Sequence, residues 1–235
     1  KYYETSPDAT LGKPINSGDG YTPGWSAIVG VELDDLDNQD EVLFYRSDGL
    51  FRYYEIGAGG LLSSPILAGD GYSSNWSSIT ALDLQGDGQD ELLFYSDDGT
   101  FKFYEAKPDA SLGPPMLSGD GYSPDWSLIV AVDLDGSGDD ELLFYKEDGT
   151  FKYYDVKSDG SLGSPILSGT GYTPGWSSIV AVDLDGDWQD ELLFYEDDGT
   201  FKYYDVKLDG SLGSPILSGT GYSLGLSIIA ALDLD

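Results

Sequence analysis

One stretch decides the fold of this chain: FKYYDVKSDGSLGSPILSGTGYTPGWSSIVAVDLD, which runs from Phe151 to Asp185 and returns with few changes from Phe201 to Asp235. Weaker copies begin at Phe101, at Phe51 and, one residue short, at Lys1. A period of about 50 residues is typical of supersecondary units that bury their apolar faces against one another. We therefore treat residues 1–235 as a single domain whose repeat units start near residues 1, 51, 101, 151 and 201.

Each unit contains four short runs of β-forming residues. In the fourth copy these runs are Ser177 to Asp183, Glu191 to Tyr195, Phe201 to Val206 and Ser214 to Leu217, with Gly, Asp and Ser clusters between them that are typical of turns. The pair Asp198-Gly199 predicts a tight hairpin between the second and third runs, because glycine accepts the positive φ of such turns. Four antiparallel strands per unit predict the blade of a β-propeller, in which radial packing protects the strand edges.

The number of blades follows from a count of these runs. The apolar run before the acidic loop occurs five times, near Ile28, Ile79, Ile129, Ile179 and Ile228, whereas the run of the ELLFY type occurs four times. We predict an all-β, five-bladed propeller of four-stranded blades, with the apolar runs lining the central channel. The closing blade would be shared by both termini, and the sequence holds no second strand for it.

Composition excludes several classes of function. The net charge of −32 arises from 43 acidic residues against 11 Lys and Arg, and such a field repels phosphate backbones and anionic lipids. The absence of Cys and His removes disulfides, thiol chemistry, the commonest zinc ligands and the usual general base. From the acidic charge we expect no nucleic acid partner. No run of 18 apolar residues and no basic, apolar leader is present, so we expect no insertion into a membrane.

The loop after each apolar run carries acidic residues at alternate positions. The copy DLDGDWQDE, from Asp183 to Glu191, has acidic side chains at positions 1, 3, 5 and 9 and glycine at position 4. Calcium prefers hard oxygen ligands, and alternate residues of a tight loop can point at one ion. The competing interpretation is an Asx turn that caps strand ends, with the charge serving solubility alone.

On the calcium interpretation, we expect the Asp183 loop to bind most tightly and the loop from Glu32 to Glu41, which has an inserted residue, to be the weakest. The predicted ligands are Asp83, Gln85, Asp87, Gln89, Glu91, Asp133, Asp135, Ser137, Asp139, Glu141, Asp183, Asp185, Asp187, Gln189 and Glu191.

The aromatic residues also recur in columns. Large rings between blades are typical of propeller packing, so we assign the tyrosines of the LLFY and KYY runs to the core. The G-Y-x-x-x-W stretch lies among small polar residues, where a ring can stack on a sugar, although a Trp that locks neighbouring blades is the alternative. The fifth copy has Leu226 in place of Trp. The predicted sugar-binding residues are Tyr21, Trp25, Tyr72, Trp76, Tyr122, Trp126, Tyr172, Trp176 and Tyr222.

These motifs resemble known repeats. The stretch WSSIVAVDLDGDWQDELLFY and its copies are similar to the FG-GAP or VCBS-type repeat of integrin-like propellers, whose blades carry DxDGDG calcium loops. The LLFY run, the Gly hairpin and the G-Y-x-x-x-W stretch also resemble the blades of bacterial and mushroom propeller lectins. The resemblance covers the whole chain, although those lectins are typically seven-bladed and this chain has five units. It implies a calcium-binding propeller and leaves the ligand open.

Two functions remain after these exclusions. An enzyme needs a locally unique set of groups, whereas nearly every polar residue here recurs four or five times, so we expect no catalysis. Near-identical sites on a ring suit multivalent recognition. We therefore expect a lectin with calcium as its cofactor, secreted or at the cell surface, that binds cell-surface or extracellular glycans. The alternative is a calcium-stabilised structural or adhesive propeller that binds protein and no sugar. Either could form a homo-oligomer.

Overall fold

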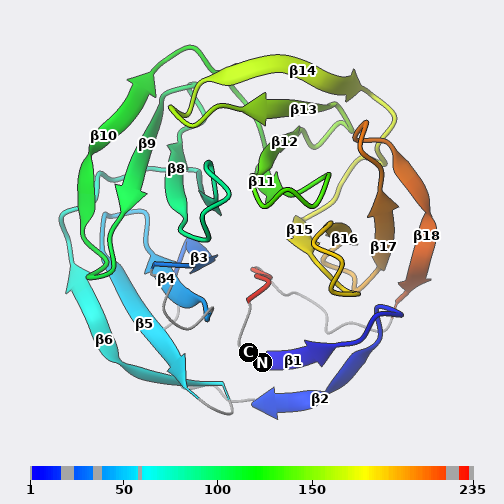
Figure 1. The fold of residues 1–235 in the computed structure, drawn as a ribbon, viewed down its shortest axis with the longest axis horizontal. Coiled ribbons are helices and arrows are strands. Elements are labelled where there is room, and N and C mark those ends of the chain that lie inside the picture. Colours follow the sequence, from blue (N-terminus) through cyan, green and yellow to red (C-terminus); the bar gives the residue numbers. More distant parts are fainter. Residues whose placement is uncertain (1, 17–23, 34–38, 58–59, 221–227, 233–235) are drawn as a thin grey trace.

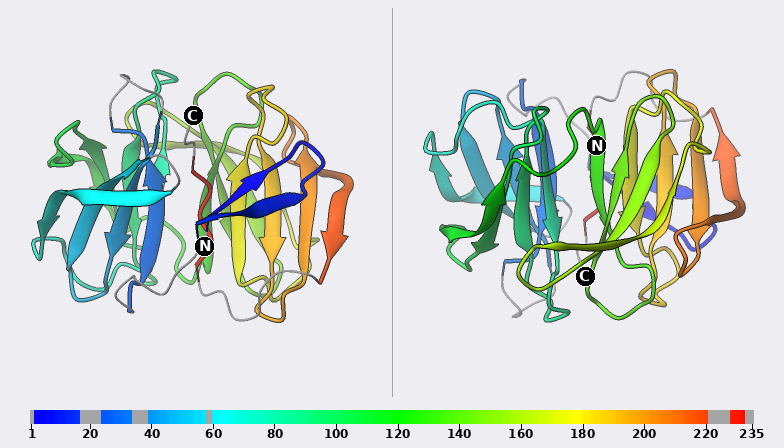
Figure 2. Two further views of the ribbon diagram at one scale, coloured as in Figure 1. Left: turned by 90° about the horizontal axis from the view of Figure 1, so that it is seen from below. Right: turned by 90° about the horizontal axis from the view of Figure 1, so that it is seen from above.

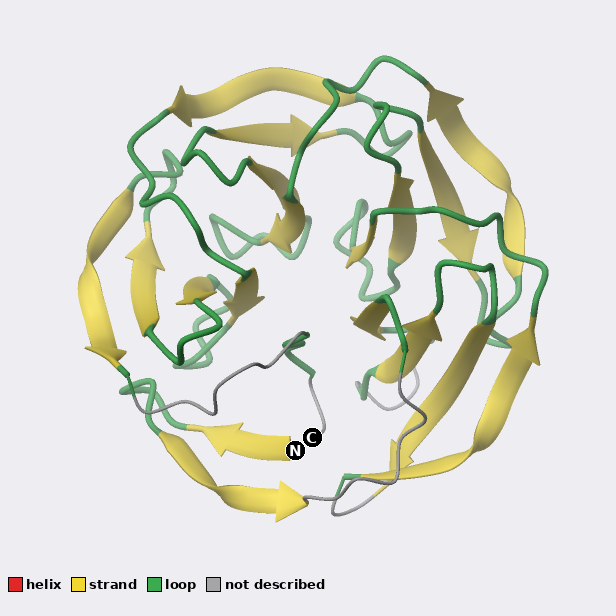
Figure 3. Cartoon of the chain, turned by 180° about the vertical axis from the view of Figure 1, so that it is seen from behind, coloured by secondary structure: helices red, strands yellow, loops and turns green. Residues whose placement is uncertain are grey.

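The computed structural model describes residues 2–16, 24–33, 39–57, 60–220 and 228–232, and all regular structure in these residues is β-strand (Figures 1 and 3). Four antiparallel sheets of four strands each stand around a common axis, so the predicted β-propeller with four-stranded blades is confirmed. No helix that could cross a membrane occurs in the described ranges.

Each blade is a meander whose first strand lies nearest the axis and whose fourth strand lies at the rim (Figure 1). Blade one contains β3 (Ala27–Val31), β4 (Glu41–Tyr45), β5 (Phe51–Gly57) and β6 (Leu61–Gly69), and blade two contains β7 (Ser78–Leu82), β8 (Glu91–Tyr95), β9 (Phe101–Ala106) and β10 (Leu112–Gly119). Blade three contains β11 (Leu128–Val132), β12 (Glu141–Tyr145), β13 (Phe151–Val156) and β14 (Leu162–Gly169), and blade four contains β15 (Ser178–Val182), β16 (Glu191–Tyr195), β17 (Phe201–Val206) and β18 (Leu212–Gly219).

The Asp-Gly hairpins form as the sequence predicts. Gly149 has φ +86°, and a Cβ there would lie 2.2 Å from the carbonyl oxygen of Tyr172, so only glycine fits. The hairpin between β12 and β13 therefore packs directly on the loop that enters blade four. The same close approach recurs at Gly49 and Gly99.

The fourth strand is longer than predicted. In blade four it covers Leu212–Gly219, whereas the sequence suggests Ser214 to Leu217. Its register with β17 shifts on either side of Tyr204, which is opposite Pro215. Proline is tolerated because this strand lies at the sheet edge, where a missing N–H breaks no further ladder.

The core is divided into layers between neighbouring blades. Between blades two and three, Leu93, Tyr95 and Phe103 of one blade pack with Leu142 and Phe144 of the next, and all five are at most 1% exposed. Equivalent clusters fill the other layers. Because successive residues of a strand point to opposite faces, each second strand contributes to two layers and is buried on both sides.

The fifth sector of the ring differs from the four blades. We use this name for the sheet of β1 (Tyr2–Thr5) and β2 (Leu11–Asn16) together with residues 228–232. The sheet is two-stranded, so the predicted fifth blade of four strands is not present among the described residues. The run of the ELLFY type occurs four times in residues 1–235 and forms the second strand of the four blades, so among the described residues no strand of this type lies between residues 228–232 and β1. The first and the last described segments, β1 and residues 228–232, both lie in this sector (Figures 1 and 2).

Candidate functional site

The acidic loops join the first and second strands of each blade and lie close to the ring axis (Figure 1). In each described loop, the first aspartate holds the backbone in place. Asp83 accepts hydrogen bonds through Oδ1 from the backbone N–H groups of Gln85 (2.9 Å) and Gly86 (2.8 Å), and through Oδ2 from that of Gly88 (2.7 Å). Asp133 makes all three corresponding bonds, and Asp183 accepts from the backbone N–H groups of Gly186 and Trp188. The Asx-turn geometry is therefore present.

The closing glutamate of each loop turns back onto the start of the loop. Glu91, Glu141 and Glu191 each accept through Oε2 from the backbone N–H of the second loop residue, at 3.2, 3.2 and 3.0 Å. Burial raises the pKa of Glu141 to about 7 and that of Glu191 to about 6. A proton or a cation would relieve the cost of burying these carboxylates.

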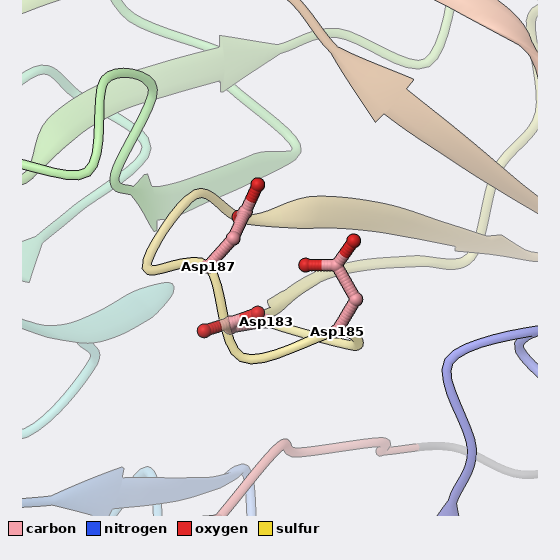
Figure 4. Close-up of side chains that lie close together, drawn as sticks. All are labelled: Asp183, Asp185 and Asp187. Atoms are coloured by element: carbon pink, nitrogen blue, oxygen red, sulfur yellow. The ribbon is translucent and has the colours of Figure 1, made fainter.

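The Asp183 loop brings three predicted ligands together. Asp183, Asp185 and Asp187 are exposed and each offers a carboxylate oxygen within 4.8 Å of the others (Figure 4). This is the single acidic group of that kind in the described ranges. Three converging carboxylates provide part of the six to eight oxygen ligands that calcium takes, so the residues present fit the ion. Glu191 does not belong to this group of carboxylates.

In the two preceding loops the predicted ligands bond to one another instead. The side-chain amide of Gln85 donates to Glu91 (3.2 Å), and the hydroxyl of Ser137 donates to Asp139 (2.6 Å). Asp87 accepts from the backbone N–H of Gln89 at 3.2 Å, a bond that Asp187 also makes with Gln189, at 3.0 Å. Asp135 likewise accepts from that of Ser137, at 3.0 Å. Neutral groups at these positions thus replace one converging carboxylate with an internal hydrogen bond.

The sequence analysis missed a column of structural carboxylates at the eighth loop position. Asp90, Asp140 and Asp190 each link their own blade to the preceding one. Asp190 accepts through Oδ2 from the backbone N–H of Asp133, and its own N–H donates to the carbonyl of Asp133, both at 2.9 Å. Burial raises the pKa of Asp190 to about 7. The signal was the recurrence of Asp beside Glu in every loop, at Asp40, Asp90, Asp140 and Asp190.

The G-Y-x-x-x-W rings lie within the layers between blades. Trp126 and Trp176 are 5% exposed, and Tyr122 and Tyr172 are 9% and 8% exposed. The ring of Tyr172 stacks on Phe151 at 3.9 Å between centroids, and Trp176 packs on Phe194 at 5.4 Å. These four residues occupy packing positions.

Three other members of the predicted sugar-binding set are half-buried: Trp25, Tyr72 and Trp76. Tyr21 and Tyr222 lie outside the described residues.

A column of cations covers the tryptophans, which the sequence analysis also missed. Lys102 lies 5.7 Å from the ring of Trp76, and Lys202 lies 5.4 Å from that of Trp176. Arg52 and Lys152 take the same place over Trp25 and Trp126. The repeated FK or FR pair was the available signal. Each half-buried cation is attracted to the indole face and leaves less of that face open to a ligand.

The tyrosine that ends each second strand fixes the G-Y-x-x-x-W loop. The hydroxyl of Tyr145 donates to the carbonyl of Thr173 at 3.0 Å and accepts from the backbone N–H of Trp176 at 3.3 Å. Tyr45 and Tyr95 make the same pair of bonds. These hydrogen bonds hold each of these G-Y-x-x-x-W loops against the end of the second strand of the preceding blade.

Trp188 is the most exposed large apolar residue in the part of the chain that the structure describes, at 74%. It occupies the loop position that glycine holds in the two preceding loops, and it has φ +73°, where Gly88 and Gly138 have +80° and +90°. A left-handed backbone costs a non-glycine residue about 1–2 kcal/mol. The indole ring is therefore exposed on the acidic loop, and the left-handed backbone of Trp188 lowers the stability of the fold.

The order of strands and the radial arrangement define the class of protein: an all-β propeller of repeated four-stranded blades. No family model and no curated protein matches the chain. Among solved structures, it is similar to the crystal structure of BBS1N in complex with ARL6DN, soaked with lead, with 14% sequence identity and a TM-score of 0.45. That alignment covers 88% of this chain, which spans little more than half of the other (56%).

Proposed function

We propose that this chain is a non-enzymatic binding propeller whose acidic loops hold calcium and whose loop face binds a macromolecular partner. The observation that carries the proposal is the convergence of Asp183, Asp185 and Asp187 on one exposed loop. Calcium there would neutralise part of the −32 charge and stiffen the loop that presents Trp188. An exposed tryptophan held in an unfavourable backbone conformation suits contact with a partner, since aromatic residues dominate the energetics of interfaces.

The finer architecture belongs to the same proposal: a ring of five sectors, of which the fifth is shared by both chain ends. The packing of residues 228–232 against blades four and one supports this arrangement. Ile229 contacts the cluster of Leu184 and Tyr203 in blade four, and Leu232 contacts the cluster of Val42 and Phe44 in blade one. Residues 228–232 thus bridge the two blades that flank the sector. Secretion or display at the cell surface is also part of the proposal, because extracellular modules use calcium sites of modest affinity.

Calcium binding is tested by thermal unfolding. Binding to the native state alone stabilises by about 2.7 kcal/mol when the free ion is at a hundred times its Kd, so Tm should rise with calcium concentration. Asp185→Asn should remove most of this rise because it takes away one of three converging carboxylates. Asp197→Asn makes the same charge change on an exposed residue outside the loops and should leave the rise intact. An unchanged Tm between chelator and saturating calcium, with no heat of binding, would contradict the calcium site.

The partner is a protein on this proposal, and the expected contact is Trp188. Trp188→Gly removes the exposed ring and relieves the left-handed strain, so it should not lower Tm while it weakens capture of the partner. The readout is binding of the wild-type and variant chains to extracellular matrix and cell-surface proteins, in calcium and in chelator. Equal binding by Trp188→Gly would exclude this residue as the contact.

Glycan is a second candidate ligand, supported by the partial exposure of Trp25, Tyr72 and Trp76 among small polar residues. A glycan array with and without chelator separates the two candidates. Trp76→Ala should reduce avidity if sugar stacks on this ring, with Trp188→Ala as the matched exposed control. If the wild-type chain binds no glycan on the array, protein binding remains as the proposed function.

A further inference from the structure

We propose that Asn75 is an acceptor site for N-linked glycosylation, so that the secreted chain carries one covalent oligosaccharide on the loop that enters blade two. The acceptor motif of this modification is asparagine, any residue except proline, and then serine or threonine. Asn75, Trp76 and Ser77 form this motif. The inference rests on the secretion included in the proposed function and is independent of the calcium site.

The motif occurs once in the sequence, at a position where the repeats differ. Asn16 and Asn38 are the other two asparagines, and the residues two places after them are Gly18 and Asp40. A serine follows each tryptophan of the G-Y-x-x-x-W stretch, as Ser26, Ser77, Ser127 and Ser177, whereas the residue before the tryptophan is Gly24, Asn75, Asp125 and Gly175 in turn. The acceptor amide is therefore particular to the loop that enters blade two.

This loop holds Asn75 in a left-handed turn. Asn75 has φ +70°, and its backbone N–H donates to the carbonyl oxygen of Ser47 at 3.0 Å. Asp125 and Gly175 have φ +65° and +93°, and each makes the corresponding bond to the hairpin of the preceding blade. Because the same turn forms with aspartate or glycine, the backbone geometry does not itself require asparagine at residue 75.

The serine of the motif has a structural role in every blade. The hydroxyl oxygen of Ser77 accepts a hydrogen bond from the backbone N–H of Asp97 at 2.9 Å. Ser26, Ser127 and Ser177 accept the same bond in their own loops. The fold therefore explains why the serine recurs, and the asparagine is the residue that completes the acceptor motif.

The side chain at this loop position points into open space. Asn75 and Ser77 are both exposed. A Cβ built at the same position, on Gly24 or Gly175, would have no atom of a non-neighbouring residue within 4 Å. Among the described residues, Nδ2 of Asn75 donates only to the hydroxyl of the adjacent Ser74, at 3.3 Å. An oligosaccharide on Nδ2 would therefore displace no packed group.

The covalent step forms one bond and breaks one. The donor is an oligosaccharide whose first sugar is linked to a lipid diphosphate. Nδ2 of Asn75 bonds to the anomeric carbon of that sugar, the bond between this carbon and the diphosphate oxygen breaks, and the lipid diphosphate leaves with the electron pair. Nδ2 loses one proton, and no group is oxidised or reduced.

The glycan would lie on the face of the ring opposite the acidic loops. In each blade the G-Y-x-x-x-W loop precedes the first strand and the acidic loop follows it. In blade two that strand is β7, whose five residues span about 17 Å. Trp188 lies in an acidic loop, so its ring stays uncovered. A bulky polar glycan on the other face would leave the face of the acidic loops as the one open to a partner.

The test expresses the full chain behind a cleavable secretory leader in eukaryotic cells and recovers it from the medium, so that the result does not depend on how the chain is naturally exported. Digestion with peptide:N-glycosidase converts a glycosylated asparagine to aspartate, so intact mass and peptide mapping count and locate the glycans. We expect one glycan, on Asn75. Asn75→Asp, which copies the residue of blade three, and Ser77→Ala should carry none. Ser77→Thr keeps the hydroxyl group and should carry one.

Asp125→Asn is the matched variant that gains a site. It places the motif in the same left-handed turn of the next loop, before Trp126 and Ser127, and should carry two glycans. Enzymatic removal of the wild-type glycan should change Tm by less than about 2 °C, as for other surface changes in a chain of this size. It should also leave the rise of Tm in calcium and the binding through Trp188 unchanged.

An unmodified Asn75 in protein recovered from the medium overturns the inference, and it does so even if Asp125→Asn gains a glycan at residue 125. The inference is equally overturned if Ser77→Ala keeps the glycan, or if removal of the glycan abolishes binding through Trp188. Calcium titrations of Tm on the same preparations show separately whether the calcium site fails.

Discussion

One buried hydroxyl group lacks a partner because of a single difference between copies. Tyr53 and Tyr153 bond through their hydroxyl groups to Tyr72 and Tyr172, at 2.8 Å in each case. Phe103 stands at the same position in the second blade, so the buried hydroxyl of Tyr122 has no hydrogen-bond partner among the described residues. Leaving a buried polar group unpaired costs about 1–3 kcal/mol.

Phe103→Tyr should therefore stabilise the protein, by about 1 kcal/mol, because it restores the hydroxyl pair found in blades one and three. The measurement is the free energy of unfolding in urea. Tyr172→Phe is the matched control and should lower the free energy of unfolding by a similar amount, since it leaves Tyr153 unpaired. A loss of stability in Phe103→Tyr would mean that the layer has no room for the added oxygen.

At the scale of single elements, the strands could be predicted from the sequence, whereas the direction in which the side chains of the loops point could not. The second and third strands of blade four begin and end at the predicted residues, because alternating apolar residues bounded by Asp-Gly turns carry a period that the sheet requires. The G-Y-x-x-x-W loop has no such period. Whether its rings face solvent or a neighbouring blade depends on contacts with Phe151 and Phe194, which lie in other elements.

The aromatic columns lead to a prediction about stability. Trp176→Ala should lower the free energy of unfolding by about 3–5 kcal/mol, because a large buried ring leaves a cavity between blades three and four. Trp188→Ala changes the same residue type at an exposed position and should have little effect. Urea unfolding of both variants is the measurement. If Trp176→Ala were as stable as the wild type, the ring would not be part of the core.

For the acidic loops, the residue types and their spacing were predictable, whereas their hydrogen bonds were not. The sequence places Gln85 and Ser137 among the calcium ligands, yet both bond to acidic residues within their own loops. A spacing rule treats every oxygen as a free ligand. Competition between neighbouring side chains appears only in three dimensions.

At the scale of the whole molecule, most of the largest fully buried side chains among the described residues are tyrosines, and each carries a hydroxyl group that can ionise. Burial raises the pKa of Tyr53 and Tyr153 well above the usual value, and it raises those of Tyr45 and Tyr95 as well. A group whose pKa is raised in the folded state contributes stability that is present below its unfolded pKa, near 10, and is lost as the pH rises through its folded pKa.

We therefore expect Tm to be insensitive to these groups at neutral pH and to fall steeply above about pH 10. Absorbance of tyrosinate should appear in two stages, first from exposed rings and then from buried rings as the protein unfolds. The same titration in guanidinium provides the reference, because all tyrosines are exposed there. A single stage near pH 10 in the folded protein would contradict the burial of these hydroxyl groups.

The paired bonds made by Asp90, Asp140 and Asp190 have a consequence for how the molecule comes apart. Each of these residues fastens its blade to the preceding one, so the four blades form a directional series of nearest-neighbour couplings. Among the described residues, the fifth sector has two strands, whereas each blade has four. Opening should start there, release the β1–β2 hairpin and residues 228–232 together, and move inward blade by blade, so that blades two and three are the last to exchange their amides with solvent.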